Sequence, residues 1–156
     1  MDDTQGRRLD DRLPVVIEDG ITLTDLIDRV AAARGKPMRV VELPELSKSG
    51  SLCGMWLATD TEDIVLHAPS ESALHRGQFI LHELAHMILR HDEITPAASA
   101  APIIADIDVA AVNTVLTRNR LGEQLERDAE ILADELAAVI RRQRRRARSR
   151  FMEVFG

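Results

Sequence analysis

At 156 residues and 17.4 kDa, with 45% apolar and 29% charged residues, the chain has the size and composition of one globular domain. This balance excludes a disordered or fibrous chain, and no apolar run approaches the ~20 residues of a membrane span. The formal charge of −6 conceals an acidic body, because residues 141–150 hold 7 of the 20 basic side chains and leave 13 basic against 26 acidic ones.

We expect one domain with two distinct end segments. Residues 1–12 are charged and without period, which predicts a flexible N-terminus, and they lack the apolar stretch of a signal peptide. Residues 13–140 hold the apolar segments of a single domain, and residues 141–156 form an arginine-rich tail. Cys53 is the single cysteine and cannot form an internal disulfide, which favours a reducing compartment and predicts a cytoplasmic protein.

A first helix of roughly ten residues is predicted after residue 24. Apolar side chains recur there at helical spacing, and Thr24 or Asp25 is placed to cap the first turn. Gly35 is a common residue at a helix end, and Pro37 prevents continuation because proline lacks the backbone N–H.

Three short segments rich in β-formers and bounded by Pro, Gly and Ser follow at 38–43, 54–59 and 63–68. We predict that they form a small antiparallel sheet, with "TDTE" as the hairpin turn between the last two. A substrate backbone could pair with a free edge of the strand at 63–68 by strand addition.

A central helix is predicted after the last of these strands. Ser70 or Ser72 can cap it, and the apolar pattern runs to about Arg90. The helix is apolar on nearly all sides, which is typical of a buried helix.

The remainder of the chain predicts a connection and two further helices. Residues 92–107 contain two prolines and five alanines without a clean period, which predicts a loop. A short helix is expected through residues 109–118. After Gly122, a long helix with an apolar stripe begins near Glu123 and continues into the arginine run.

The central helix contains the pattern His-Glu-x-x-His at residues 82–86. Residues four apart share one face of a helix, so His82 and His86 can bind a single zinc ion together. Glu83 projects beside this pair, where its carboxylate can activate a water molecule for attack on a carbonyl. The alternative is a separate hydrogen bond for each polar group. Because buried His and Glu are unfavourable without partners, one metal is the simpler explanation.

A catalytic zinc needs a third protein ligand, and two downstream positions are candidates. His91 comes five residues after His86, one short of the three-histidine motif, and on a continuing helix it would lie about 140° around from His86. Glu126 and Glu130 share one face of the last helix, which suits a ligand and a second carboxylate that holds a ligand histidine by its other ring nitrogen. A solvated acidic face explains the two glutamates equally well.

Together these motifs resemble the ImmA/IrrE family of zinc metallopeptidases, in particular its small actinobacterial members. The resemblance covers "LHELAHMILRH" within about 64–91 and "GEQLERDAEILADELA" within about 119–137. Ala85 stands where a glycine is common, and Asp128 where glutamate or glutamine is usual. The resemblance implies a zincin-like α+β fold, in which the small antiparallel sheet packs on a helical core that contains the histidine helix.

The resemblance also implies roles for particular residues and a kind of partner. His82, His86 and Glu126 match the zinc ligands, and Glu83 matches the catalytic glutamate. Better-known members relieve helix-turn-helix repressors, so a DNA-binding repressor is the expected protein substrate. The leading hypothesis is therefore a zinc endopeptidase in transcription regulation. The alternative is a zinc-containing module that controls a partner without proteolysis.

Two further features leave alternatives open. The chain has no tyrosine, so the candidates to stabilise an oxyanion, besides the metal, are His67, His75 and His91, each of which could equally be structural.

The run from Arg141 to Arg150 could bind nucleic-acid phosphates, but the acidic body and the lack of interleaved aromatics argue against it. This run could instead dock on the acidic body, extend the last helix or contact an acidic partner.

Overall fold

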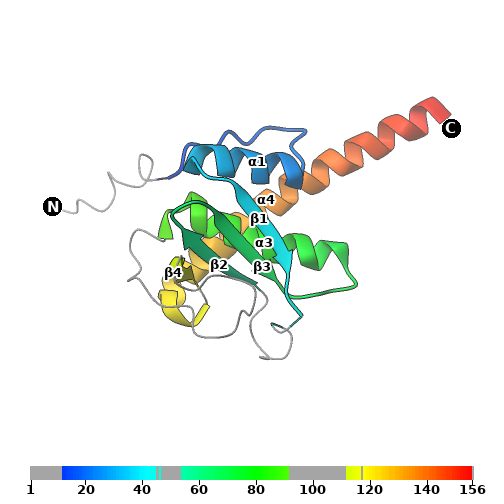
Figure 1. Ribbon diagram of the computed structural model, residues 1–156. Coiled ribbons are helices and arrows are strands. Elements are labelled where there is room, and N and C mark those ends of the chain that lie inside the picture. Colours follow the sequence, from blue (N-terminus) through cyan, green and yellow to red (C-terminus); the bar gives the residue numbers. More distant parts are fainter. Residues whose placement is uncertain (1–11, 45, 47–53, 92–111, 117, 156) are drawn as a thin grey trace.

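The computed structural model describes residues 12–44, 46, 54–91, 112–116 and 118–155. In chain order these form α1 (Leu23–Arg34), β1 (Met38–Glu42), β2 (Gly54–Thr59), β3 (Asp63–His67), α3 (Ala73–Ile88), β4 (Val112–Leu116) and α4 (Arg118–Phe155). Figure 1 shows the four strands side by side with α1, α3 and α4 packed around them. The chain is an α+β protein, as the sequence predicts.

The sheet is mixed, with the strand order β1-β3-β2-β4. The hairpin predicted between β2 and β3 is confirmed, and the two strands pair antiparallel. The prediction of a wholly antiparallel sheet is wrong, because β3 inserts between β1 and β2 and runs parallel to β1. Both sides of β3 are therefore paired, which rules out strand addition at this strand. Within the described sheet, the edges belong to β1 and β4.

The two faces of the sheet bury different side chains. Successive residues of a strand point to opposite faces, so Trp56, Ala58 and Val65 pack toward the three helices. Their neighbours Leu57 and Ile64 pack into a second cluster on the other face. Because β2 and β3 are buried on both faces, they provide a rigid platform for the central helix.

The end of the sheet near α1 is fixed by a buried ion pair. Asp63 is fully buried and accepts hydrogen bonds from the Arg34 guanidinium and, at 3.0 Å, from Trp56 Nε1. The guanidinium lies over the Trp56 ring, 4.6 Å from its centre. These contacts join α1 to β2 and β3, so the carboxylate is paired inside the core.

The predicted first helix is confirmed, but it starts earlier than expected. Thr22, and not Thr24 or Asp25, is the N-cap, because the Thr22 hydroxyl accepts from Asp25 N–H while the Asp25 carboxylate accepts from Thr22 N–H. At the other end, Gly35 adopts a left-handed conformation with φ of 74°, as predicted for a helix end.

The central helix is confirmed as α3, with Ser72 as its N-cap. It ends at Ile88, two residues before the predicted end, and Arg90 adopts a left-handed conformation with φ of 57°. This turn changes the direction of the chain just before His91.

The segment at 109–118 contains the strand β4, so the short helix predicted there is wrong. Val112, Thr114 and Val115 are β-branched, and pairing with β2 satisfies the backbone, so the strand is favoured over a helix. The loop predicted at 92–107 and the flexible N-terminus predicted at 1–12 lie outside the described residues, apart from Arg12.

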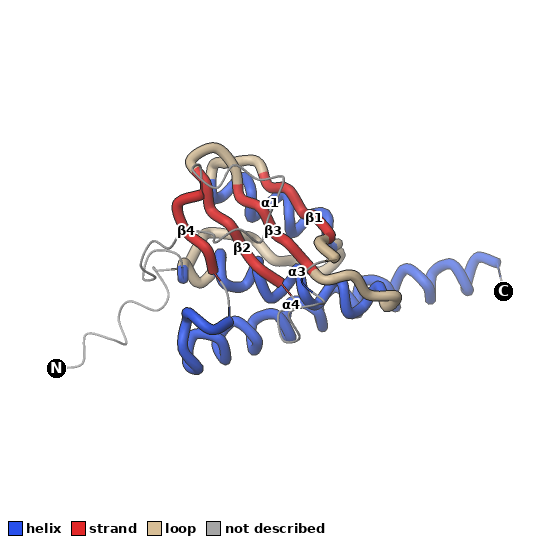
Figure 2. Tube along the Cα trace, turned by 60° about the horizontal axis from the view of Figure 1, so that its bottom comes forward, coloured by secondary structure: helices blue, strands red, loops and turns tan. Residues whose placement is uncertain are grey.

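The helix α4 interrupts its helical geometry at Gly122, where φ is 77° and ψ is 161°, so the long helix begins after this residue as predicted. It packs against α3 along the apolar stripe and then continues through the arginine run, projecting away from the sheet (Figure 2). No helix in the described ranges combines the length and the apolar character needed to cross a membrane.

Candidate metal centre

The central helix places the histidine pair on the side that faces α4. Its apolar side chains Leu84, Ala85 and Met87 are fully buried, so the helix is fixed by packing on several sides. Within this packing His86 is buried, with 2% of its surface exposed, and His82 is half-buried. The rings of the two histidines meet edge to face, with 3.1 Å between their Nε2 atoms.

The helix α4 brings Glu126 to the same point. Its Oε2 lies 2.9 Å from His82 Nε2, and its Oε1 lies 3.4 Å from His86 Nε2. The ligand atoms of the three residues all lie within 4.8 Å of one another. Two imidazole nitrogens and a carboxylate thus converge from segments 40 residues apart, and this cluster could hold a metal ion.

Glu126 Oε1 is a buried atom that is left without a hydrogen bond among the described residues. A buried acceptor without a hydrogen bond is unfavourable, because the group has lost its hydrogen bonds to water, and the contact with His86 at 3.4 Å replaces them only in part. A cation placed between the three residues would satisfy this oxygen, so the cluster has the chemistry of a metal site.

Charges in the cluster shift the pKa values of its members in opposite directions. Burial tends to raise the pKa of Glu126, but contact with His82 and His86 outweighs it and lowers that pKa to about 2. For His82, burial opposes the positive form, yet the hydrogen bond to Glu126 and the nearby carboxylates raise its pKa. Burial dominates at His86 and lowers its pKa, so this ring favours the neutral form that a metal requires.

Glu83 lies beside the cluster and is enclosed by the first residue of β2. Gly54 leaves room for it, because a Cβ at position 54 would lie only 2.9 Å from Glu83 Oε1. Burial raises the pKa of Glu83 to about 8, against the opposing influence of His82. Its Oε2 is buried and has no hydrogen-bond partner among the described residues. This carboxyl group is therefore poised to take up or hold a proton.

His91 contacts the cluster in a way that the sequence did not predict. The turn at Arg90 returns the chain, so His91 Nδ1 lies 2.8 Å from His86 Nδ1. Only one of these nitrogens can carry the shared proton. If His86 Nε2 binds a metal, His86 Nδ1–H donates to His91, which fixes the orientation of the ligand ring. The sequence placed His91 about 140° around the helix from His86 on the assumption that the helix continues. The helix instead ends at Ile88, so that geometry does not apply to His91.

Glu130, one turn after Glu126, is exposed. Its charge contributes to the raised pKa of His82, so it is near enough to act electrostatically. The outer ring nitrogen of His86, Nδ1, contacts His91 and not a carboxylate, so Glu130 does not hold His86 by that nitrogen.

The other two oxyanion candidates lie in different surroundings. His67 ends β3 directly opposite Gly54, and its Nδ1 lies 3.1 Å from the Ala68 carbonyl oxygen, to which it donates. In the neutral ring this leaves Nε2 as an acceptor, which does not stabilise an oxyanion. His75 is exposed in the first turn of α3 and stacks on Phe79.

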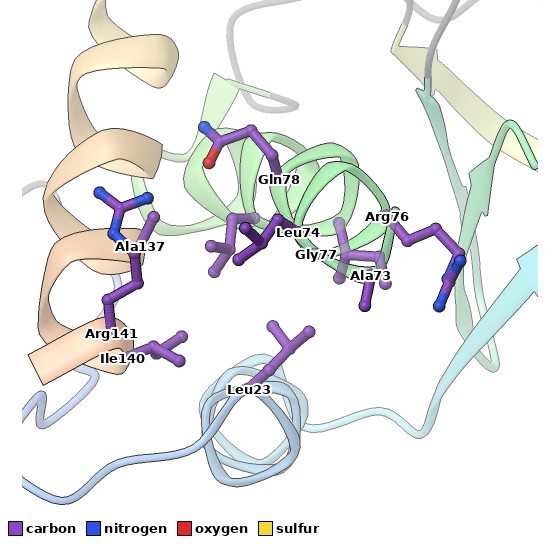
Figure 3. A pocket seen from close by; sticks show the side chains of 11 residues that line it. Leu23, Ala73, Leu74, Arg76, Gly77, Gln78, Ala137, Ile140 and Arg141 are labelled. Atoms are coloured by element: carbon purple, nitrogen blue, oxygen red, sulfur yellow. The ribbon is translucent and has the colours of Figure 1, made fainter. Parts of the chain in front are cut away.

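An apolar hollow of about 200 Å³ lies apart from the cluster, between α1 and the start of α3 and beside α4. Figure 3 shows Leu23 and Ile140 pointing into it, with Gly77 on its α3 side. None of the cluster residues lines it.

Comparison with known proteins identifies no relative of this chain. No family model, curated protein or solved structure matches it significantly.

Proposed function

We propose that this chain is a zinc-dependent endopeptidase. The observation that carries the proposal is the convergence of His82 and His86 from α3 with Glu126 from α4. Zinc binds imidazole and carboxylate ligands at about 2.0 to 2.1 Å, so two ligand atoms of a tetrahedral site lie about 3.3 Å apart. The two imidazole nitrogens lie 3.1 Å apart, Glu126 Oε2 lies 2.9 Å from His82 Nε2 and Glu126 Oε1 lies 3.4 Å from His86 Nε2, which is near this value for either carboxylate oxygen. Three protein ligands would leave the fourth position of the zinc for water.

The chemistry of the proposed reaction divides between the ion and Glu83. When bound, Zn²⁺ supplies Lewis-acid chemistry, which lowers the pKa of water and polarises a carbonyl. Glu83 would accept the proton of the attacking water and return it to the leaving amine. Its position beside the cluster, enclosed by Gly54, suits a group that takes a proton from water and passes it on.

The chain's own packing holds these groups in place. His91 would fix the ring of His86, and the contact between α3 and α4 sets the position of Glu126 relative to the histidines. The edge strands β1 and β4 are the ones that could accept an extended substrate backbone in the described sheet.

The resemblance of the motifs to the ImmA/IrrE family extends the proposal to a zincin-like fold and to a substrate class. That class is a regulatory protein, specifically a helix-turn-helix repressor, cleaved in the cytoplasm. The resemblance rests on the residues around His82 and Glu126.

A second candidate function is a zinc-containing module that controls a partner without proteolysis. The observation that favours it is the enclosure of Glu83, which is only 5% exposed and packs against Gly54. A carboxylate so buried could serve to organise the ligands alone.

Zinc content per purified chain tests the site. We expect about one zinc in the wild type and a clear loss in Glu126→Ala. Glu130→Ala is the matched control, because it removes the same group one turn further along α4 at an exposed position. Equal zinc in both variants, or none in the wild type, would refute the assignment of Glu126.

Hydrolysis of fluorescein-labelled casein then separates the two functions. Glu83→Gln keeps the shape of the side chain but removes the base, so we expect it to retain zinc and lose hydrolysis by at least about 100-fold. Activity that survives in this zinc-loaded variant would refute the role of Glu83. A zinc-loaded wild type that is inactive on casein and on a repressor partner would favour the non-proteolytic module.

A further inference from the structure

The helix α4 continues far beyond the packed body of the protein. Ile140 is its last buried residue among those whose side chains are described. Beyond it, Arg142, Arg145 and Arg148 are exposed, and Figures 1 and 2 show this part of the helix projecting away from the sheet and the other helices. In this extension, residues 141–150, the side chains of Arg142, Arg145 and Arg148 therefore do not dock on the acidic body.

The extension carries one sign of charge along its whole length. Residues 136–152 contain seven arginines and no acidic residue. Within residues 141–150, four pairs of arginines are spaced four residues apart, and like charges at this spacing destabilise a helix. Because the extension has no anion of its own, an external polyanion would stabilise it.

The composition of the extension indicates what kind of polyanion fits. A helix that docks in a protein groove presents apolar anchors along one face, but Ala147 is the only apolar residue within 141–150. Arginines are instead distributed around the helix, as needed to reach phosphates on both walls of a groove. All seven basic residues are arginine, whose guanidinium binds phosphate with two parallel hydrogen bonds.

We propose that residues 141–150 bind the phosphate backbone of duplex DNA. The major groove of B-form DNA is about 12 Å wide and admits an α-helix, whereas the deep, narrow major groove of duplex RNA does not. The acidic body repels the same polyanion, and the projection of the extension keeps the two apart. The binding is independent of base sequence, because arginine contacts to phosphates carry no sequence information. It does not depend on the proposed proteolysis.

The test measures fluorescence anisotropy of a labelled 25-base-pair duplex from about 50 to 300 mM NaCl, with the full chain. The variant R142Q/R145Q/R148Q removes three exposed arginines of the extension. The matched control R12Q/R39Q/R127Q removes three exposed arginines of the body, so net charge changes equally. We expect the extension variant to bind at least tenfold more weakly at 100 mM and to lose about 3 from the slope of log affinity against log salt. The control should keep the wild-type slope.

Three outcomes would overturn the proposal. Equal weakening in both variants would mean that only net charge matters, and a wild type that fails to bind the duplex at 50 mM would remove the site altogether. Poly-glutamate that competes as well as DNA would indicate an acidic protein as the partner. The wild-type slope of log affinity against log salt tests the proposal even if a variant unfolds. A slope shallower than about −2 would mean that too few arginines of the extension contact phosphates.

Discussion

Replacing Glu83 by glutamine should stabilise the metal-free protein at neutral pH and leave its stability unchanged in mild acid. The cause is the burial of the carboxyl group, which raises its pKa from 4.5 to about 8. Between these two values the folded state holds a proton that the unfolded chain has lost. Stability conferred by this group therefore falls as pH rises from about 4.5 to about 8.

The size of the effect follows from the same two values. Each pH unit in this window corresponds to about 1.4 kcal/mol, and about 2.5 pH units separate 4.5 from pH 7. The wild type should thus be about 3 kcal/mol less stable than Glu83→Gln at pH 7. Near pH 4.5 both side chains are neutral, and the two proteins should have nearly equal stability.

Urea unfolding in the presence of a chelator measures this difference directly. With an m-value of about 1 to 3 kcal/mol per molar, the midpoint of Glu83→Gln should be about 1 to 3 M higher at pH 7. The control Glu130→Gln changes an exposed carboxylate and should show no such pH-dependent gain. A difference between Glu83→Gln and the wild type that stays constant from pH 5 to 7.5 would refute the reasoning, because a shape effect does not titrate.

Three further predictions concern stability and the histidine pair. Gly77→Ala places a Cβ in the apolar hollow, 3.9 Å from the nearest atom, so it should stabilise the helix by about 0.5 to 1 kcal/mol. Calorimetry should show a Tm higher by about 1 to 4 °C, and a lower Tm would contradict this. Asp63→Ala removes the carboxylate that pairs with the buried Arg34 guanidinium and should destabilise the protein by about 3 to 5 kcal/mol in urea. Adding Arg34→Met should recover part of this loss, and a loss below about 1 kcal/mol would refute the importance of the pair. His91→Ala removes the acceptor for His86 Nδ1–H, so zinc affinity in chelator competition should fall by about 10- to 100-fold, and unchanged affinity would mean that His91 does not orient the ring.

Local patterns were sufficient for the elements that depend on local interactions. The spacing of apolar side chains predicts α3, and with it the stacking of His82 and His86 on one face, because four residues make about one turn. The hairpin of β2 and β3 follows in the same way from two β-rich segments and a short polar turn.

The remaining features depend on contacts between distant segments. The parallel pairing of β1 with β3 and the strand β4 are set by partners elsewhere in the sheet. The position of His91 requires a left-handed conformation at Arg90, and arginine has no local preference for positive φ. No local pattern could therefore have placed His91 against His86.

The choice between Glu126 and Glu130 depends on the rotation of α4 about its own axis. At 100° per residue, Glu126 lies about 40° closer than Glu130 to the middle of the buried stripe formed by Ala129, Leu132, Ala133 and Leu136, and it is 7% exposed. Glu130 lies at the border of this stripe and is exposed. This alignment with the apolar stripe is a signal in the sequence that distinguishes the two glutamates, beyond their spacing of four residues.

One helix carries both Glu126 and the arginine extension, and this arrangement sets a fixed distance. Arg145 is 19 residues after Glu126, and at 1.5 Å per residue the two lie about 29 Å apart along the axis of α4. A helix is a stiff spacer, unlike a flexible tether that would sample many separations. The arginines of the extension span residues 141–150, so a molecule held along it would offer the histidine and glutamate cluster those of its segments that lie about 22 to 36 Å away along the helix. The helix would raise the local concentration of those parts of the bound molecule that lie within this range of distances, and it would keep nearer and farther parts away from the cluster.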